Sequence, residues 1–260
     1  VQLIDAIGGG HLWAERFDRS VDDVFTVQDE VTAKIVEALV GRLTAAQIPE
    51  RRRPANLEAY DLCVRGRALV LQSPQAAHEA RLLFERATAL DPGFAEAHRW
   101  LALSFTSSKL WGEPMGTNRR LALATAQKAV SLDPNDAGTR WVYGSVLTEE
   151  HRWIEAEAEF GVALQLDPNN ADAWAMLSEL MVLSGRAADA IFDTEKALRL
   201  NPHPPGWYYW FLGQAQYLDR QYDRAVQTLR REETYRTVSR RTLAAIFRPS
   251  CATPRRHWTN

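Results

Sequence analysis

The stretch 165-QLDPNNADAW-174 decides the fold of this chain, because its Leu-Asp-Pro core recurs along the sequence. The same phrase occurs in 131-SLDPNDAGTR-140 and 89-ALDPGFAEAH-98, and with Asn in place of Asp in 199-RLNPHPPGWY-208. The gaps between the four prolines are 42, 34 and 34 residues. A fixed period of 34 residues indicates a repeat architecture in which each unit is one supersecondary motif.

Each unit has the residue pattern of two helices that end at the proline. In the unit that ends at Pro168, a large and a small residue stand together at Tyr143 and Gly144, and alanine occupies positions 156 and 163. The next unit has Leu177, Ser178, Ala190 and Ala197 at the same offsets. Small side chains let two helix backbones approach closely, and proline cannot continue a helix. We therefore expect a helix–turn–helix unit before each Leu-Asp-Pro.

This pattern resembles the tetratricopeptide repeat family, whose 34-residue unit carries Trp, Leu-Gly, Tyr, Ala, Phe, Ala and Pro at such offsets. The resemblance covers residues 59–238 and implies a mainly α fold, an α-solenoid of four clear repeats plus a degenerate fifth. The 42-residue gap places eight additional residues between the two helices of the second unit, in the segment 107–120. The fifth unit lacks a closing Leu-Asp-Pro.

Residues 1–50 have no partner at the repeat period. β-branched residues, then a glycine cluster at 8–10 and an aromatic-containing run predict a β-hairpin. Apolar residues at helical spacing predict one long amphipathic helix over 21–46. The motif GHLWAERFD with DVFTVQDEV resembles the end of a TolB-like α/β domain. We therefore expect a partial α/β segment at 1–50 and a linker at 51–58.

In many bacterial proteins a TolB-like domain links an upstream module to a tetratricopeptide array. The resemblance implies one of two upstream modules, a class III adenylate or guanylate cyclase domain or a winged-helix DNA-binding domain. The sequence of neither module is present in this chain. We favour the C-terminal part of a cyclase-type signalling protein, and the alternative is the C-terminal region of a winged-helix transcriptional regulator.

Residues 239–260 form a basic tail, because no acidic residue follows Glu233. The tail supplies little of the polar capping helix that a solenoid needs at its end. We expect 248–260 to be disordered, and we hypothesise that this terminus is not native and arises, for example, from a frame change.

Composition indicates a globular protein that acts in the cytoplasm. The 260 residues are 46% hydrophobic and 25% charged, and the formal net charge is −2. This balance gives no overall field that would favour nucleic acid or an anionic membrane. No apolar run approaches a membrane span, and two cysteines far apart in sequence are typical of free thiols in a reducing compartment.

Catalytic, metal and cofactor sites are not expected in this chain. The six histidines are scattered without the spacing of a metal site or a nucleophile relay. The carboxylates of 17-FDRSVDDVFT-26 are interpreted as the start of a helix, where they meet the backbone dipole. The glycines at 8–10 lack the sequence context of a phosphate-binding loop.

A binding surface remains, and the resemblance places it in the groove lined by the first helix of each unit. The residues at groove positions are Glu96, Arg99, Trp141, Ser145, Asp172, Glu179, Trp207, Trp210, Gln214 and Tyr217. Aromatic residues and arginine most often anchor a partner, so we expect a protein or peptide ligand. The catalytic domain of the parent protein is one candidate for this ligand. The alternative for Trp141 and Trp210 is that they pack between repeats.

Overall fold

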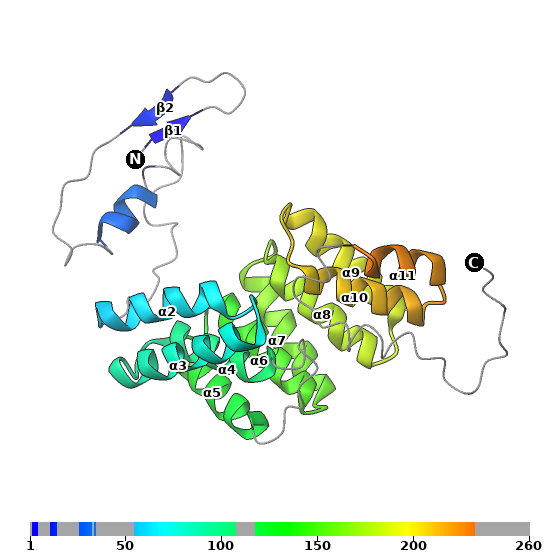
Figure 1. Ribbon diagram of the computed structural model, residues 1–260, viewed down its shortest axis with the longest axis horizontal. Coiled ribbons are helices and arrows are strands. Elements are labelled where there is room, and N and C mark those ends of the chain that lie inside the picture. The colour runs from blue at the N-terminus through cyan, green and yellow to red at the C-terminus, as the bar shows by residue number, and fades with distance from the viewer. Residues whose placement is uncertain are drawn as a thin grey trace. The chain divides into compact units, whose positions relative to one another are not determined.

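The computed structural model describes residues 2–4, 11–14, 26–32, 34, 55–107 and 118–231. The chain divides into two compact units, which meet in the sequence between Arg53 and Pro54 (Figure 1). Each unit is described by itself below.

The first unit contains the hairpin that the sequence predicts. Strands β1 (Gln2–Ile4) and β2 (His11–Ala14) pair antiparallel, with Leu3 opposite Trp13. Residues 26–32 are helical, within the helix expected over 21–46. The glycine cluster, the remainder of that expected helix and the linker residues 51–54 lie outside the described residues.

The described part of the second unit is a succession of five antiparallel helix pairs, coloured from cyan to orange in Figure 1. The first helices of the pairs are α2 (Leu57–Leu69), α4 (Ala95–Thr106), α6 (Ala137–Glu149), α8 (Ala171–Leu183) and α10 (Gly206–Leu218). The second helices are α3 (Pro74–Leu90), α5 (Asn118–Leu132), α7 (Trp153–Leu166), α9 (Ala187–Leu200) and α11 (Tyr222–Leu229).

The helices of this unit form two layers. Each first helix packs against the first helix of the next pair, so that α2, α4, α6, α8 and α10 form one continuous inner layer. Each second helix packs against its own partner, and α3, α5, α7 and α9 also pack against the first helix of the following pair. This pattern is that of a solenoid, in which every repeat contacts only its neighbours.

The recurring Leu-Asp/Asn-Pro phrase makes the same turn in all four copies. The side chain before each proline accepts a hydrogen bond from the backbone N–H two residues later. The donors are Gly93 for Asp91 at 3.1 Å, Asn135 for Asp133 at 3.2 Å, Asn169 for Asp167 at 3.1 Å and His203 for Asn201 at 3.0 Å. Aspartate and asparagine are the residues that make this Asx turn, which explains why one of the two stands before each proline.

A second contact fixes the start of the following helix. The side chain six residues after the proline bonds to the carbonyl oxygen of that proline in three of the four copies. Arg140 Nε donates to Pro134 at 2.7 Å, and Trp174 Nε1 donates to Pro168 at 3.0 Å. In the first copy, His98 Nε2 lies 3.1 Å from the Pro92 oxygen. The turn is therefore held from both sides.

A glycine on one helix and a phenylalanine on its partner lie in contact in the core of the first and third pairs. Gly66 on α2 lies against the Phe84 ring, and Gly144 on α6 lies against the Phe160 ring. Both phenylalanines are fully buried, as are the alanines at the recurring offsets of the repeat, Ala80, Ala87, Ala156, Ala163, Ala190 and Ala197. Cys63 is a free, buried thiol in the first pair. The small-against-large pattern of the sequence is therefore the packing pattern.

The repeat boundaries differ in detail from the expected ones. Helix α2 begins at Leu57, two residues before the expected start of the array at 59, because the side chain of Asn56 caps it by accepting from the Ala59 N–H. The additional residues of the second unit lie between α4 and α5, as the sequence predicts, although residues 108–117 are outside the described part. Residues 232–260, which include the basic tail, also lie outside it.

Candidate binding site on the inner helix layer

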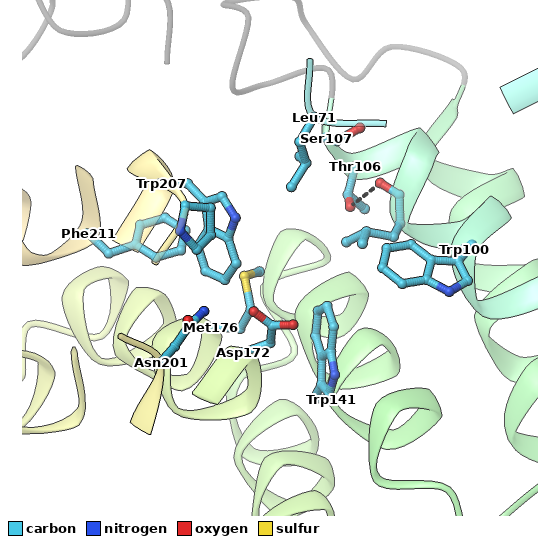
Figure 2. A pocket seen from close by; sticks show the side chains of 12 residues that line it. Leu71, Trp100, Thr106, Ser107, Trp141, Asp172, Met176, Asn201, Trp207 and Phe211 are labelled. Atoms are coloured by element: carbon cyan, nitrogen blue, oxygen red, sulfur yellow. Dashed lines mark hydrogen bonds between the residues drawn. The ribbon is translucent and has the colours of Figure 1, made fainter. Parts of the chain in front are cut away.

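A cavity of about 280 Å³ opens on the inner layer of helices (Figure 2). Its walls come from α4, α6, α8 and α10, from Leu71 after α2, and from the turn between α9 and α10. The lining residues are Leu71, Trp100, Leu103, Thr106, Ser107, Trp141, Asp172, Met176, Asn201, Pro205, Trp207 and Phe211. Four repeats therefore contribute a helix to one hollow.

Four aromatic side chains, Trp100, Trp141, Trp207 and Phe211, belong to the wall. Figure 2 shows Trp207 and Phe211 on one side and Trp100 on the other, with Trp141 between them at the base of the view. The Trp207 ring meets the Phe211 ring edge to face, with centroids 5.6 Å apart. This packing holds the Trp207 indole in place at the cavity, because such aromatic pairs have a preferred geometry.

Asp172 is the one ionisable side chain among the residues that line the cavity. It stands in the first turn of α8, next to Met176 and Trp141 in Figure 2. Burial raises the pKa of Asp172, and the hydrogen bond that it accepts from the Tyr208 hydroxyl at 2.7 Å and the Arg99 charge oppose this effect. Burial also raises the pKa of Tyr208, so the phenol remains a donor at neutral pH.

A network of charged side chains lies at one edge of the cavity. Arg99 donates to Glu96 Oε1 and to Asp136 Oδ2, each at 3.2 Å. Glu96 also accepts from Arg67 at 3.0 Å, and both guanidinium groups lie 5.3 Å from the centroid of the Trp100 ring. The cations of this edge are therefore already paired with carboxylates and stacked on an aromatic face.

Three of the ten groove residues expected from the sequence line the cavity, namely Trp141, Asp172 and Trp207. Glu96 and Arg99 belong to the charged network at its edge. Ser145, Glu179 and Trp210 are buried at 1%, 8% and 7% exposure and do not line the cavity. Gln214 and Tyr217 are half-buried and also lie outside it.

Trp141 and Trp210, for which the alternative was packing between repeats, lie in different surroundings. Trp141 is 5% exposed and lines the cavity, so it takes part both in packing and in the wall. Trp210 is 7% exposed and packs in the core, which favours the alternative that it is a packing residue.

Sequence reasoning missed most of the apolar lining. Trp100 follows the groove position Arg99 by one residue, so helix periodicity places it beside the groove face. Met176 and Phe211 follow Asp172 and Trp207 by four residues and share the groove face, but a place on that face does not decide which side chains line the cavity. Leu71, Asn201 and Pro205 lie in turns, where the offsets of helix positions carry no information. The signal that could have found Trp100 is its residue type, because a tryptophan beside a groove position is large enough to reach into the groove.

Two searches of the described residues found nothing. No group of three or more His, Cys, Asp or Glu side chains in this part of the chain is arranged to hold a metal ion. The same residues include no helix with the length and apolar character needed to cross a membrane.

The fold and the repeat pattern define a tetratricopeptide repeat solenoid. The sequence profile of a tetratricopeptide repeat family matches residues 147–192, the segment from the end of α6 into α9. Among solved structures, a thermophilic tetratricopeptide repeat protein of Thermus thermophilus matches with a TM-score of 0.53 at 19% identity. The match covers 72% of this chain and 98% of that chain, and it shows the same fold.

Two curated proteins are similar in sequence. A protein of Rhizobium meliloti (strain 1021) named "Putative adenylate cyclase 3" is 40% identical over 161 residues, which cover 60% of this chain and 27% of that protein. Human tetratricopeptide repeat protein 33 is 36% identical over 74 residues, 28% of each protein. The chain thus spans about a quarter of the length of the curated relatives that it matches.

Proposed function

We propose that this chain is a non-catalytic interaction module that binds a protein or peptide on its inner helix layer. The observation that carries the proposal is the aromatic cavity, to which four successive repeats contribute. Tryptophan is enriched among the residues that dominate binding energy, and such residues act from well-packed pockets near the centre of an interface. Trp141 and Trp207 meet this description, since each is held by packing while it lines the hollow.

We further propose that the module is the C-terminal part of an adenylate or guanylate cyclase-type signalling protein. The similarity to the Rhizobium meliloti protein supports this parent, because that protein is named "Putative adenylate cyclase 3" and the match extends over 161 residues. The TolB-like resemblance of residues 1–50 supports the same arrangement. The proposed partner is the catalytic domain of the parent protein.

The DNA before the first codon tests the parent directly. An open reading frame that encodes a cyclase domain supports the proposal. A frame that encodes a winged helix contradicts it and favours the transcriptional regulator.

A matched pair of substitutions tests the binding surface. Leu103 is half-buried and lines the cavity, whereas Ile154 on α7 is 87% exposed and lies outside it. We expect Leu103→Gln to weaken binding of the upstream domain, expressed separately, by about tenfold or more, because loss of an interface hot spot costs ~2 kcal/mol or more and a tenfold change in affinity corresponds to ~1.4 kcal/mol. Ile154→Gln should bind as the wild type does. Equal affinities of both variants, measured by isothermal titration, would contradict the inner-layer site.

A further inference from the structure

Among the described residues that line the cavity of the inner layer, one carries a carboxylate and none carries a cation. All other lining side chains are apolar, hydroxyl or amide groups. One carboxylate oxygen of Asp172 accepts the hydrogen bond from the Tyr208 hydroxyl, and the second oxygen has no hydrogen-bond partner among the described residues. No cation of the described chain lies within ion-pair distance of Asp172. A carboxylate in an apolar hollow without a cationic partner is unfavourable, so it is a natural point of recognition.

The indole rings around this carboxylate carry no cation of the described residues, although the Trp207 ring packs edge to face with Tyr208 and Phe211. Elsewhere in the array cations cover aromatic faces, as Arg67 and Arg99 cover Trp100 and Lys196 covers Trp174 at 3.7 Å. Within the described residues no cation lies over the ring of Trp141 or Trp207. The negative ring faces and the carboxylate therefore point to one kind of ligand group.

We propose that this cavity receives the arginine side chain of a partner protein, which stacks on the Trp141 and Trp207 indoles and pairs with Asp172. The inference rests on the proposed function, since it names the chemistry of the group bound at that site. The volume of about 280 Å³ lies just below the ~300–1,000 Å³ of typical small-molecule pockets, so it suits one long side chain.

Arginine fits this hollow better than lysine. The guanidinium is planar, stacks on aromatic faces and offers several N–H donors to a carboxylate. It is also more weakly hydrated than an ammonium group, so it loses less on entering an apolar site. An acidic side chain would be repelled by Asp172, and a neutral apolar side chain would bury the carboxylate without a partner.

Five pools of synthetic heptapeptides test the proposal on the full 260-residue chain. The central residue of each pool is arginine, lysine, citrulline, leucine or glutamate, and the other six positions are randomised. Citrulline is the matched control, because it has nearly the shape of arginine and no charge. We expect the arginine pool to be retained about tenfold more than the citrulline pool, since a hydrogen bond to a charged partner is worth ~1.5–3 kcal/mol.

Variants then place the effect at the cavity. Asp172→Asn keeps the shape and the acceptor for Tyr208, and it should lower arginine retention about tenfold, to the level of citrulline. Asp61→Asn is the control, because Asp61 on α2 is exposed and pairs with Arg65 away from the cavity. Thermal unfolding of both variants checks that they fold, and the comparison of arginine with citrulline on the wild type requires no variant.

The outcomes separate this inference from the proposed function. Equal retention of arginine and citrulline, or a preference for lysine, leucine or glutamate, overturns the arginine assignment. If Leu103→Gln still weakens binding of the upstream domain in that case, the inner-layer binding function stands without it. An arginine preference that survives in Asp172→Asn also overturns the assignment. Retention of no pool, together with equal binding of Leu103→Gln and Ile154→Gln to the upstream domain, overturns both proposals.

Discussion

At the scale of single residues, the array is built from positions where only a few side chains can serve. The residue before each proline must accept a hydrogen bond from the backbone two residues later, as Asp167 does from Asn169 and Asn201 does from His203. Aspartate and asparagine do this in turns because their short side chains carry an oxygen at the right distance. The same turn in four copies explains why only aspartate or asparagine stands at this position.

A second such position is the glycine where two helices of one pair cross. A Cβ atom added to Gly66 would lie 2.5 Å from Phe84 Cε1, whereas one added to Gly161 on α7 would meet nothing within 4 Å. We therefore expect Gly66→Ala to lower the free energy of unfolding by about 1–3 kcal/mol through overpacking. Gly161→Ala should raise it by about 0.5–1 kcal/mol, because alanine is the better helix former.

Urea unfolding of the two glycine variants beside the wild type measures both effects. The pair is matched, since each change adds one methyl group to a helix of the array. Equal stability of Gly66→Ala and Gly161→Ala would show that Phe84 moves aside and that the crossing is not tight.

Residue patterns predicted the array well and the cavity only in part. The spacing of prolines, small residues and alanines was sufficient for the helix pairs, because a buried offset imposes the same side-chain size in each repeat. The cavity depends on which neighbouring ring reaches inward, and Trp100 or Phe211 can be assigned to it only after the helices are placed. The Tyr208–Asp172 hydrogen bond joins residues 36 positions apart on two helices, and no local sequence pattern predicts it.

At the scale of elements, helix α9 carries a buried carboxylate on the outer side of the fourth repeat. Asp193 is 7% exposed, and burial, with the nearby charge of Asp189, raises its pKa to about 6. The folded state therefore binds this proton more tightly than the unfolded state, whose pKa is near 3.8. The contribution of Asp193 to stability is present below about pH 4 and is lost as the pH rises through about 6.

We expect Asp193→Asn to be more stable than the wild type at pH 7.5 by about 1 kcal/mol. This figure is smaller than the one that the full pKa shift of Asp193 implies, because solvent around Arg186 and Asp189 screens the charge. At about pH 4 the two proteins should differ little, because the folded wild type then carries a protonated, uncharged side chain like that of asparagine. Urea unfolding at the two pH values measures the difference. The exposed control Asp61→Asn should show no such pH dependence of its difference from the wild type, and a variant that is less stable at pH 7.5 would contradict the assignment.

Helix α11 shows why the degenerate fifth repeat was predictable. It has 8 residues, against 14 in α7 and α9, and no Leu-Asp-Pro follows it. Its inward residues Ala225 and Leu229 are buried against α10, and Leu229 takes the place that phenylalanine has in the first and third pairs. The fifth pair therefore keeps the buried contact between its two helices, but its second helix is shorter.

At the scale of the whole array, stability depends on how many neighbours a repeat has. Helices α6, α7, α8 and α9 have repeats on both sides, whereas α11 packs mainly on α10. Because each repeat buries its apolar face against its neighbours, we expect an array to open first at an end. Amides of α6 to α9 should exchange hydrogen at least about tenfold more slowly than amides of α11, as measured by mass spectrometry on the full chain. Equal protection of α11 would show that residues beyond it form a folded cap.

The buried thiol of the first helix pair has a reactivity that depends on the folded state. Cys63 is 1% exposed, and burial raises its pKa to about 12, so Cys63 carries almost no thiolate at neutral pH in the folded protein. The thiolate is the form of cysteine that attacks alkylating reagents and disulfides, so this sulfur is unreactive while α2 and α3 stay together. In a Cys251→Ser background, the rate at which the sulfur is modified therefore reports how often the first helix pair separates, without any introduced label.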